Sequence, residues 1–381
     1  MRSQEVSMNP RFFSLAFFSL FLLSLTGPSF AADPKSGWQG EWEQTVKAAE
    51  KEGKLSVYLS TSDDLEKILK VFQQKFPKIG VLPVSGGLQV AVRILSERRA
   101  ERYIPDVVVT GPGTPYYVLY QGKALDPIHA AFILPEVLDG SKWWEGKHHY
   151  VDEEGKYVFV FNGPISQGRI YYNTRLVKPA EFKSYQDLLS PKWKGKILSI
   201  DTRLPGAARL GLREFYHMPE LGPKFLRRLF TEMEITFTRD SRQAADWLSV
   251  GKFPLCLFCG DARYAKDQGL PVDELRTSHW PEAPTISPGG NSTMVLLNRA
   301  PHPNASKVFI NWFLSREGQT VFQQLMNRPD TIFDSMRTDI PKDPIPPENR
   351  RRPGVKYVMM ATAERADHAP VEKLLREILK Q

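Results

Sequence analysis

The first third of the chain alternates between two hydrophobic periods. Residues 54–60, KLSVYLS, alternate as a strand does. The apolar residues that follow recur with the spacing of one helix face: Leu65, Ile68, Leu69, Phe72 and Phe76. A short strand near 80–84, a helix that ends near Glu101 and the apolar strand DVVVTG at 106–111 come next. Strand, helix, strand, helix, strand predicts a parallel sheet with helices on both faces.

The middle of the chain predicts a second unit of this kind. The adjacent strands KYVFVF, 156–161, and GRIYYNTRLV, 168–177, flank a Gly-Pro turn, which is typical of a sheet edge or of a crossing between domains. Strands and helices then alternate from KILSID, 196–201, to FPLCLF, 253–258, with Ser241 as the predicted cap of one helix. The sequence therefore predicts an α/β protein with two units.

The last part of the chain predicts a further strand and helix, followed by a tail. The segment 287–298 ends in a buried strand, and the helix after it has the apolar face Val308, Phe309, Trp312 and Phe313. Beyond Pro329 the chain is rich in proline and charge, and it ends with an amphipathic helix at 371–379.

The N-terminus has the pattern of a secretory signal peptide. Arg2 and Arg11 precede an apolar run at 12–25, and Ser29 and Ala31 suit cleavage before Ala32. The run is about 14 residues long, short of the ~20 that a membrane-spanning helix needs, although a retained anchor is the alternative. We expect residues 1–31 to be removed and the mature protein to be exported and soluble.

Composition and charge narrow the function. Of 381 residues 41% are apolar and 25% are charged, and the net charge of +8 becomes +7 once residues 1–31 are removed. The largest basic cluster, ENRRRPG at 348–354, lies in a proline-rich stretch, and we interpret the basic residues as scattered, solvated charge. The sequence shows no basic face interleaved with aromatic residues, so nucleic-acid binding is not predicted. A mature chain of about 350 residues suggests two domains.

Six short loops follow the predicted strands. They are small and mostly polar: STS (60–62), SGG (85–87), TGPG (110–113), DTR (201–203), TRDS (238–241) and CGD (259–261). In an open α/β sheet, ligands bind beyond the carboxyl ends of the strands, where backbone N–H groups attract anions or carbonyl dipoles. Each loop alone reads equally well as an ordinary helix cap or turn. Together they favour a ligand cleft.

Motifs of common enzyme classes are missing from the sequence. It contains no GxxxxGK[ST], HExxH or GxSxG, and its seven histidines are scattered. We predict no catalytic residue, no cofactor and no metal site. An exported enzyme stays the alternative, because a triad assembled in space leaves no trace in sequence.

The order of these segments resembles a known family. YLSTSD, FPKIGVLPVSGG, IPDVVVTG, GRIYYNTRLV and SYQDLLSPKWKGKI, with 298–324 after them, resemble the extracellular solute-binding proteins of ABC importers over about 42–326. More narrowly, they resemble the type II periplasmic binding proteins grouped with ferric-iron, thiamine and aminoethylphosphonate binders. The resemblance implies a periplasmic monomer of two α/β lobes, with a ligand cleft between lobes joined by a two-strand hinge. It implies as partners a small-molecule ligand and a membrane ABC permease with its ATPase; a ligand sensor on the same scaffold is an alternative.

The resemblance and the patterns together predict the lobe boundaries. Lobe 1 is expected to comprise 34–167 and 290–325, and lobe 2 to comprise 168–289. The tail, 326–381, is expected to pack on the lobes, and crossings near Gly168 and Ser287 should form the hinge.

The predicted ligand is a small organic anion. Arg203, Arg239 and Arg263 follow strands of lobe 2, and guanidinium groups bind carboxylate or phosphonate. The alternatives are salt bridges to nearby aspartates, a cation such as thiamine, or ferric iron, whose tandem tyrosines this chain lacks at CGDARY, 259–264. The full predicted ligand-binding set is Ser60, Thr61, Ser62, Ser85, Gly86, Gly111, Tyr172, Asp201, Thr202, Arg203, Arg239, Asp240, Ser241, Asp261, Arg263 and Asn291.

The chain has two cysteines, Cys256 and Cys259. In one extended strand they would be too far apart to pair, so a disulfide requires a turn at Leu257 or Phe258. An exported protein meets oxidising conditions, and both states stay open. We expect a buried strand that enters the cleft at Cys259.

Overall fold

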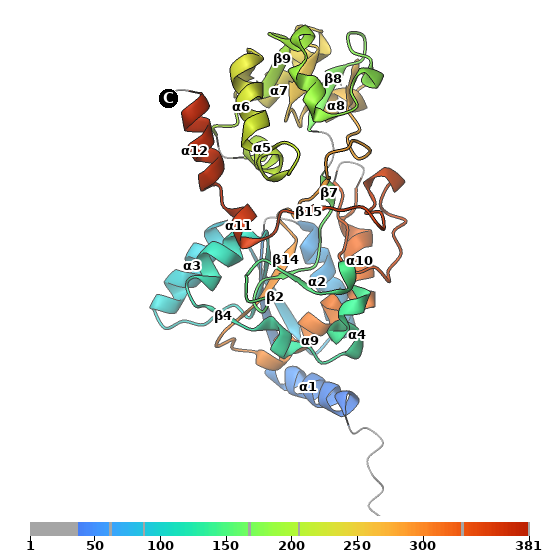
Figure 1. Ribbon diagram of the computed structural model, residues 1–381. Coiled ribbons are helices and arrows are strands. Elements are labelled where there is room, and N and C mark those ends of the chain that lie inside the picture. The colour runs from blue at the N-terminus through green and yellow to red at the C-terminus, as the bar shows by residue number, and fades with distance from the viewer. Residues whose placement is uncertain are drawn as a thin grey trace, which may run out of the picture.

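The computed structural model describes residues 37–60, 63–86, 88–166, 169–204, 206–328 and 331–379. The predicted signal peptide, 1–31, lies outside them. Figure 1 shows two lobes, one above the other, joined by a narrow region where β7 and β15 lie. We call the lower one lobe 1 and the upper one lobe 2.

Lobe 1 is built on a sheet of seven strands. The order is β2-β1-β3-β14-β6-β5, with β4 beside β14. Their bounds are β1 (Lys54–Leu59), β2 (Gly80–Ser85), β3 (Val107–Thr110), β4 (Leu125–Asp126), β5 (His149–Tyr150), β6 (Phe159–Val160) and β14 (Thr293–Leu297). β1 pairs in parallel with β2 and β3, as the alternating pattern predicts, and β14 returns antiparallel to β3.

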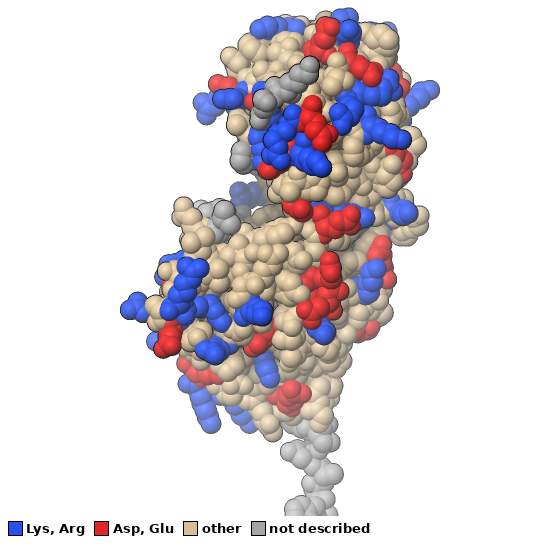
Figure 2. Space-filling view, turned by 60° about the vertical axis from the view of Figure 1, so that its left-hand side comes forward, with Lys and Arg blue, Asp and Glu red and all other residues tan. Residues whose placement is uncertain are grey.

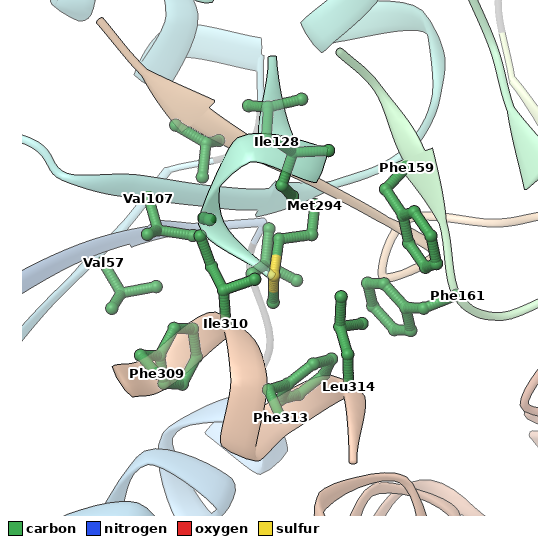
Figure 3. Close-up of a cluster of buried hydrophobic side chains, with 14 of the residues drawn as sticks. Val57, Val107, Ile128, Phe159, Phe161, Met294, Phe309, Ile310, Phe313 and Leu314 are labelled. Carbon is green, nitrogen blue, oxygen red and sulfur yellow. The ribbon is translucent and has the colours of Figure 1, made fainter. Parts of the chain in front are cut away.

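The helices of lobe 1 pack around this sheet in one hydrophobic core. They are α1 (Trp38–Glu52), α2 (Asp63–Lys75), α3 (Leu88–Arg99), the π-helical turn η1 (Pro115–Tyr120), α4 (Pro135–Leu138), α9 (Pro303–Leu314) and α10 (Arg316–Met326). Figure 3 shows Ile310 and Phe313 of α9 pointing toward Met294 of β14 in the core, where all three side chains are buried. The predicted face of α9 (Val308, Phe309, Trp312 and Phe313) is buried, but so is Ile310 outside it, because α9 is covered by the sheet and by neighbouring helices, with Phe309 and Trp312 against Phe72 of α2.

Lobe 2 is built on a second sheet, of five strands. The order is β10-β9-β11-β8-β12. The strands are β8 (Ile170–Asn173), β9 (Ile197–Ile200), β10 (Thr236–Thr238), β11 (Leu255–Leu257) and β12 (Val272–Glu274). The helices are α5 (Ala207–His217), α6 (Gly222–Glu232), α7 (Ser241–Ser249), α8 (Ala262–Asp267) and α12 (Ala369–Ile378). Because successive strand residues face opposite sides, Leu255 and Leu257 pack with α5, α6 and α12, while Cys256 packs with α7 and α8.

A small third sheet connects the lobes. β7 (Ile165–Ser166) and β13 (Thr285–Ile286) pair antiparallel, and β15 (Val358–Met359) pairs in parallel with β13. β6 and β8 belong to different sheets, so the Gly-Pro turn at 163–164 begins a crossing between domains. The two crossing strands match the predicted hinge, and the tail adds a third strand that its proline-rich sequence does not indicate. The exact lobe boundaries stay a prediction, since 167 and 168 lie outside the described residues.

The tail contacts both lobes. On lobe 1, Ser335 and Arg337 form β-bridges with Asn162 and Trp143. On lobe 2, α12 packs in one hydrophobic cluster with α5 and α6. Arg351 belongs to the basic cluster that we interpreted as solvated charge, but it is buried. That interpretation is wrong for Arg351, because the folded tail places the carboxylate of Asp334 3.1 Å from its guanidinium.

Lys342 of the tail should give the protein a pH-dependent stability. Burial lowers the pKa of Lys342 from 10.5 to about 8, although its ammonium lies 2.7 Å from Asp334. Between about pH 8 and 10.5 the unfolded chain therefore binds more protons at this lysine than the folded chain does. Stability should rise with pH across this window as the penalty for the buried charge is relieved, and below pH 8 the penalty is fully present. Chemical denaturation of the wild type and of Lys342→Met should show this rise only in the wild type; equal pH profiles would contradict it.

Candidate functional site

One edge of the lobe 1 sheet gathers the loops that follow β1, β2 and β3. The backbone N–H of Ser60 donates to Val109 (3.1 Å), and that of Gly86 donates to Leu59 (3.2 Å). The hydroxyl of Ser60 donates to the side-chain oxygen of Asn291, in the segment that leads into β14. The structure thus brings Ser60, Gly86 and Asn291 to one edge.

Gly111 joins this edge through a close backbone approach. A Cβ atom at position 111 would lie 3.1 Å from the carbonyl oxygen of Gly289 and 3.3 Å from the Cα of Gly290. Such contacts are tighter than most Cβ atoms make, so glycine is favoured here and any larger residue would need the backbone of Gly289 and Gly290 to shift by a few tenths of an ångström. The small residues of TGPG therefore let the segment before β14 lie directly on the end of β3.

Other predicted residues of lobe 1 are placed differently. Thr61 and Ser62 lie outside the described residues. The Ser85 hydroxyl donates to Glu66 (3.2 Å) at an exposed position. The structure thus does not add Ser85 to the contacts that join Ser60 to Asn291.

The corresponding edge of lobe 2 centres on Asp201. Its carboxylate is 2% exposed and accepts bonds from Nε and a terminal nitrogen of Arg203 at 2.7 and 3.0 Å. Nε of Arg239 lies 3.5 Å from the same carboxylate. Burial raises the pKa of Asp201, but the hydrogen bonds and charge of Arg203 outweigh it and hold this pKa below its usual range. The salt bridges that were an alternative for these arginines are therefore present.

An open pocket adjoins this cluster. Its volume is about 420 Å³, and Asp201, Arg203, Arg239 and Asp240 are among the residues that line it. The predicted site residue Thr202 is fully buried, and within the described chain its hydroxyl has no hydrogen-bond partner. In Figure 2 the surface is indented between the lobes, and Lys and Arg are more numerous on lobe 2 than on the adjacent surface of lobe 1.

The cap of α7 differs from the prediction. The Asp240 carboxylate accepts from the backbone N–H groups of Arg242 and Gln243, so Asp240 is the N-cap and Ser241 is the first residue of the helix. The prediction of Ser241 as the cap was wrong by one residue. Aspartate and serine are equally good caps, and Asp240 has the extended backbone that an N-cap requires.

The two tyrosines of β8 point in opposite directions. Tyr172 is buried in the hydrophobic cluster with α5 and α6, so the structure does not bring this predicted ligand residue to the site. Tyr171 instead lines a cavity of about 320 Å³ between lobe 2 and the tail. Arg263 lines the same cavity, away from Asp201, while Asp261 precedes α8.

The two cysteines form a disulfide. Their Cα atoms are 5.9 Å apart, and both residues are fully buried. The chain turns at Phe258, whose φ is 61°, which is one of the two positions where a turn would permit the bond. Cys259 therefore leaves the strand direction and returns toward Cys256.

A buried carboxylate at the hinge was missed by sequence reasoning. Glu214 of α5 accepts hydrogen bonds from the hydroxyls of Ser166 and Ser287, both at 2.6 Å, and from Arg169 at 2.8 Å. Ser166 belongs to β7 and Ser287 follows β13, so one side chain holds both crossing strands to lobe 2. The available signal was a glutamate between Leu212 and Phe215, on the buried side of the helix.

The residues that the structure describes meet neither the requirements of a membrane-spanning helix nor those of a metal site. None of the described helices combines the length and apolar character needed to cross a membrane. The described part of the chain also has no group of three or more His, Cys, Asp or Glu side chains that could hold a metal ion.

Comparison with known proteins places the fold. No family model matches the sequence, and no curated protein matches it. Among solved structures, a Trichodesmium protein (IdiA, FutA) in complex with iron and citrate is 18% identical, covering 86% of this chain and 99% of that chain with a TM-score of 0.60. Iron-bound HitA from Pseudomonas aeruginosa is 18% identical, with coverage of 85% and 99% and a TM-score of 0.52. The periplasmic binding protein AfuA from Actinobacillus pleuropneumoniae, with fructose-6-phosphate bound, is 19% identical, with coverage of 86% and 99% and a TM-score of 0.53.

These likenesses confirm the predicted fold class. The match spans 86% of this chain and 99% of that chain, and this chain has two main sheets. At such low sequence identity the comparison establishes the fold but does not identify the ligand. The chain has the two-lobed α/β fold of type II periplasmic binding proteins.

Proposed function

We propose that this chain is the exported substrate-binding component of an ABC importer. It captures a small organic anion between its lobes, passes it to a membrane permease with its ATPase, and performs no chemistry itself. The fold, the signal-peptide pattern at residues 1–31 and the strand-end loops gathered at one edge of each lobe's sheet support this proposal.

The main observation in favour of an anionic ligand is that positively charged groups outnumber the carboxylate at Asp201. One carboxylate faces two guanidinium groups, and Arg203 binds it through both oxygens. Arg239 makes only the longer contact, and its side chain is 74% exposed. The Arg239 guanidinium therefore keeps donors that can bind a ligand. Guanidinium groups bind carboxylate or phosphonate through paired hydrogen bonds.

Lobe 1 would hold the uncharged part of the ligand. Ser60, Gly111 and Asn291 offer a hydroxyl, a glycine backbone and an amide at the strand-end edge of lobe 1, and none of them is charged. A neutral edge on one lobe and a basic edge on the other would suit a small molecule with one anionic end.

Cationic ligands fit less well. Asp201 is occupied by two arginines, and Asp240 accepts two backbone N–H groups at the start of α7. Asp201 is therefore already neutralised, and one carboxylate oxygen of Asp240 is used by the helix cap, which leaves less negative charge for a cation such as thiamine. Ferric iron is the second candidate, because two of the similar structures hold iron, although this chain lacks the adjacent tyrosines at 259–264.

Arg239→Gln tests the proposal. Calorimetric titration with carboxylates and phosphonates should show that this change weakens the best ligand by about tenfold to a hundredfold, because one charge-assisted hydrogen-bond donor is lost. Arg228→Gln, on the exposed side of α6, is the matched control and should leave the affinity unchanged. Equal affinities of wild type and Arg239→Gln would contradict the assignment, and conversion of a bound compound would favour the exported enzyme.

A further inference from the structure

Arg213 is a buried cation without a counter-ion. It lies in the middle of α5 and is 6% exposed. One terminal nitrogen donates to the carbonyl oxygen of Ala366 at 3.0 Å, whereas its Nε is buried without a hydrogen-bond partner. Among the described residues no carboxylate forms an ion pair with it; the adjacent Glu214 is held by Ser166, Ser287 and Arg169. Burying an unpaired charge is strongly unfavourable.

Arg213 lies where both lobes meet the tail. The short helix α11 (Ala363–Ala366) belongs to the tail, and Figure 1 shows it between the lobes. The Tyr117 hydroxyl of lobe 1 donates to the carbonyl oxygen of Ala363 at 3.0 Å. Arg213 of lobe 2 donates to that of Ala366 at the other end. The turn of α11 is thus held from both sides.

Two histidines at this junction also have buried nitrogen atoms without partners. His217 lies four residues after Arg213, on the same face of α5, and His368 follows α11. Nε2 of His217 and Nδ1 of His368 are buried and unpartnered within the described chain. Burial, with the charges of Arg365 and Arg213, lowers the pKa of His217 to about 4. Burial and the charge of Arg213 lower the pKa of His368 as well.

The other charged groups nearby do not neutralise Arg213. Arg209 pairs with Glu372 at 2.5 Å. Arg365 donates to the carbonyl oxygen of Met359 at 2.9 Å. Asp367 accepts the backbone N–H of Ala369 at 2.9 Å, and Glu364 is exposed. None of these carboxylates forms an ion pair with Arg213 in the described part of the chain.

We propose that a small oxyanion, a carboxylate or a phosphate group, binds at this junction to Arg213 with His217 and His368. Nε–H of Arg213 supplies a charged donor, and neutral imidazoles supply N–H donors. A water molecule could accept these bonds but would leave the charge unbalanced. The site is separate from Asp201 and Arg239, so it goes beyond the proposed transport ligand.

Access to the site depends on α11. The three nitrogen atoms are shut off from solvent in this structure, so an anion reaches them only when α11 moves away from α5. The bound anion would then take the place on Arg213 that the carbonyl oxygen of Ala366 now holds. Occupancy would therefore couple the tail to both lobes.

Histidine NMR tests the proposal directly. The chain has seven histidines, and the Cε1–H signals of two are identified with His217→Phe and His368→Phe. Inorganic phosphate and acetate are titrated separately, with sodium chloride at matched ionic strength as the third arm. At least one of the two oxyanions should shift the signals of His217 and His368 saturably and leave the other five in place. The arm that shifts them identifies the group as phosphate or carboxylate.

Arg213→Gln should abolish the shifts, and Arg228→Gln should not. If Arg213→Gln does not fold, Arg213→Lys keeps the charge without the Nε–H donor and should weaken binding at least tenfold. Equal shifts with chloride, absence of shifts in both oxyanion arms, shifts that persist in Arg213→Gln, or an unchanged affinity in Arg213→Lys would overturn the proposal. Arg239→Gln should leave the shifts intact; their loss there would place the anion at Arg239 and also overturn it.

Discussion

Glu214→Ala is expected to lower the free energy of unfolding by about 3 kcal/mol, because it removes one partner of a buried ion pair. Arg169 would keep its charge without the carboxylate 2.8 Å away, and the hydroxyls of Ser166 and Ser287 would lose their acceptor. Urea denaturation monitored by tryptophan fluorescence measures the change.

The control for this change is Glu232→Ala on α6. Glu232 is 51% exposed and pairs with Arg228 on the same helix, so its removal should cost less than about 1 kcal/mol. A loss at Glu214 no larger than that at Glu232 would show that the carboxylate does not hold the hinge strands.

Asp334→Ala is expected to be at least as damaging, at about 3–5 kcal/mol. Asp334 is the carboxylate that faces two buried cations of the tail, Arg351 at 3.1 Å and Lys342 at 2.7 Å. Without it Arg351 stays buried without its carboxylate, and the pKa of Lys342, already lowered to about 8 with Asp334 beside it, falls further. The same denaturation experiment measures the loss, and limited proteolysis should show earlier cleavage of the tail.

Asp273→Ala is the matched control for Asp334. Asp273 forms an exposed pair with Lys266, and this change should alter stability by less than about 1 kcal/mol. If Asp334→Ala were as mild as Asp273→Ala, the tail would not be fixed by its buried charges.

Hydrophobic periodicity was sufficient to predict the main strands and helices of the two lobes. α2 buries the predicted set Leu65, Ile68, Leu69 and Phe72, and β1 forms as predicted, although it is buried on both faces from Leu55 to Leu59. The loops after β1 and β3 also meet as predicted, since parallel neighbouring strands must end at the same edge. To predict the disulfide, one would also have needed to know that the chain turns at Phe258, and no local sequence pattern indicates this turn.

Contacts between distant segments could not be predicted from sequence. β15 is two residues long and joins a strand more than seventy positions away, so it has no period of its own. Glu214 and Arg213 are charged residues in a helix of apolar character, and only the tertiary structure shows that one meets the crossing strands and the other meets the tail. Tyr171 and Tyr172 differ only in the face of β8 that each occupies.

The central claim is that this chain binds a small organic anion between its lobes. Isothermal titration calorimetry of the mature chain, residues 32–381, against carboxylates, phosphonates, ferric citrate and thiamine tests it most directly. We predict that one carboxylate or phosphonate binds with a stoichiometry of one and that Arg239→Gln weakens this binding. Ferric citrate or thiamine as the sole ligand, with affinity unchanged in Arg239→Gln, would contradict it.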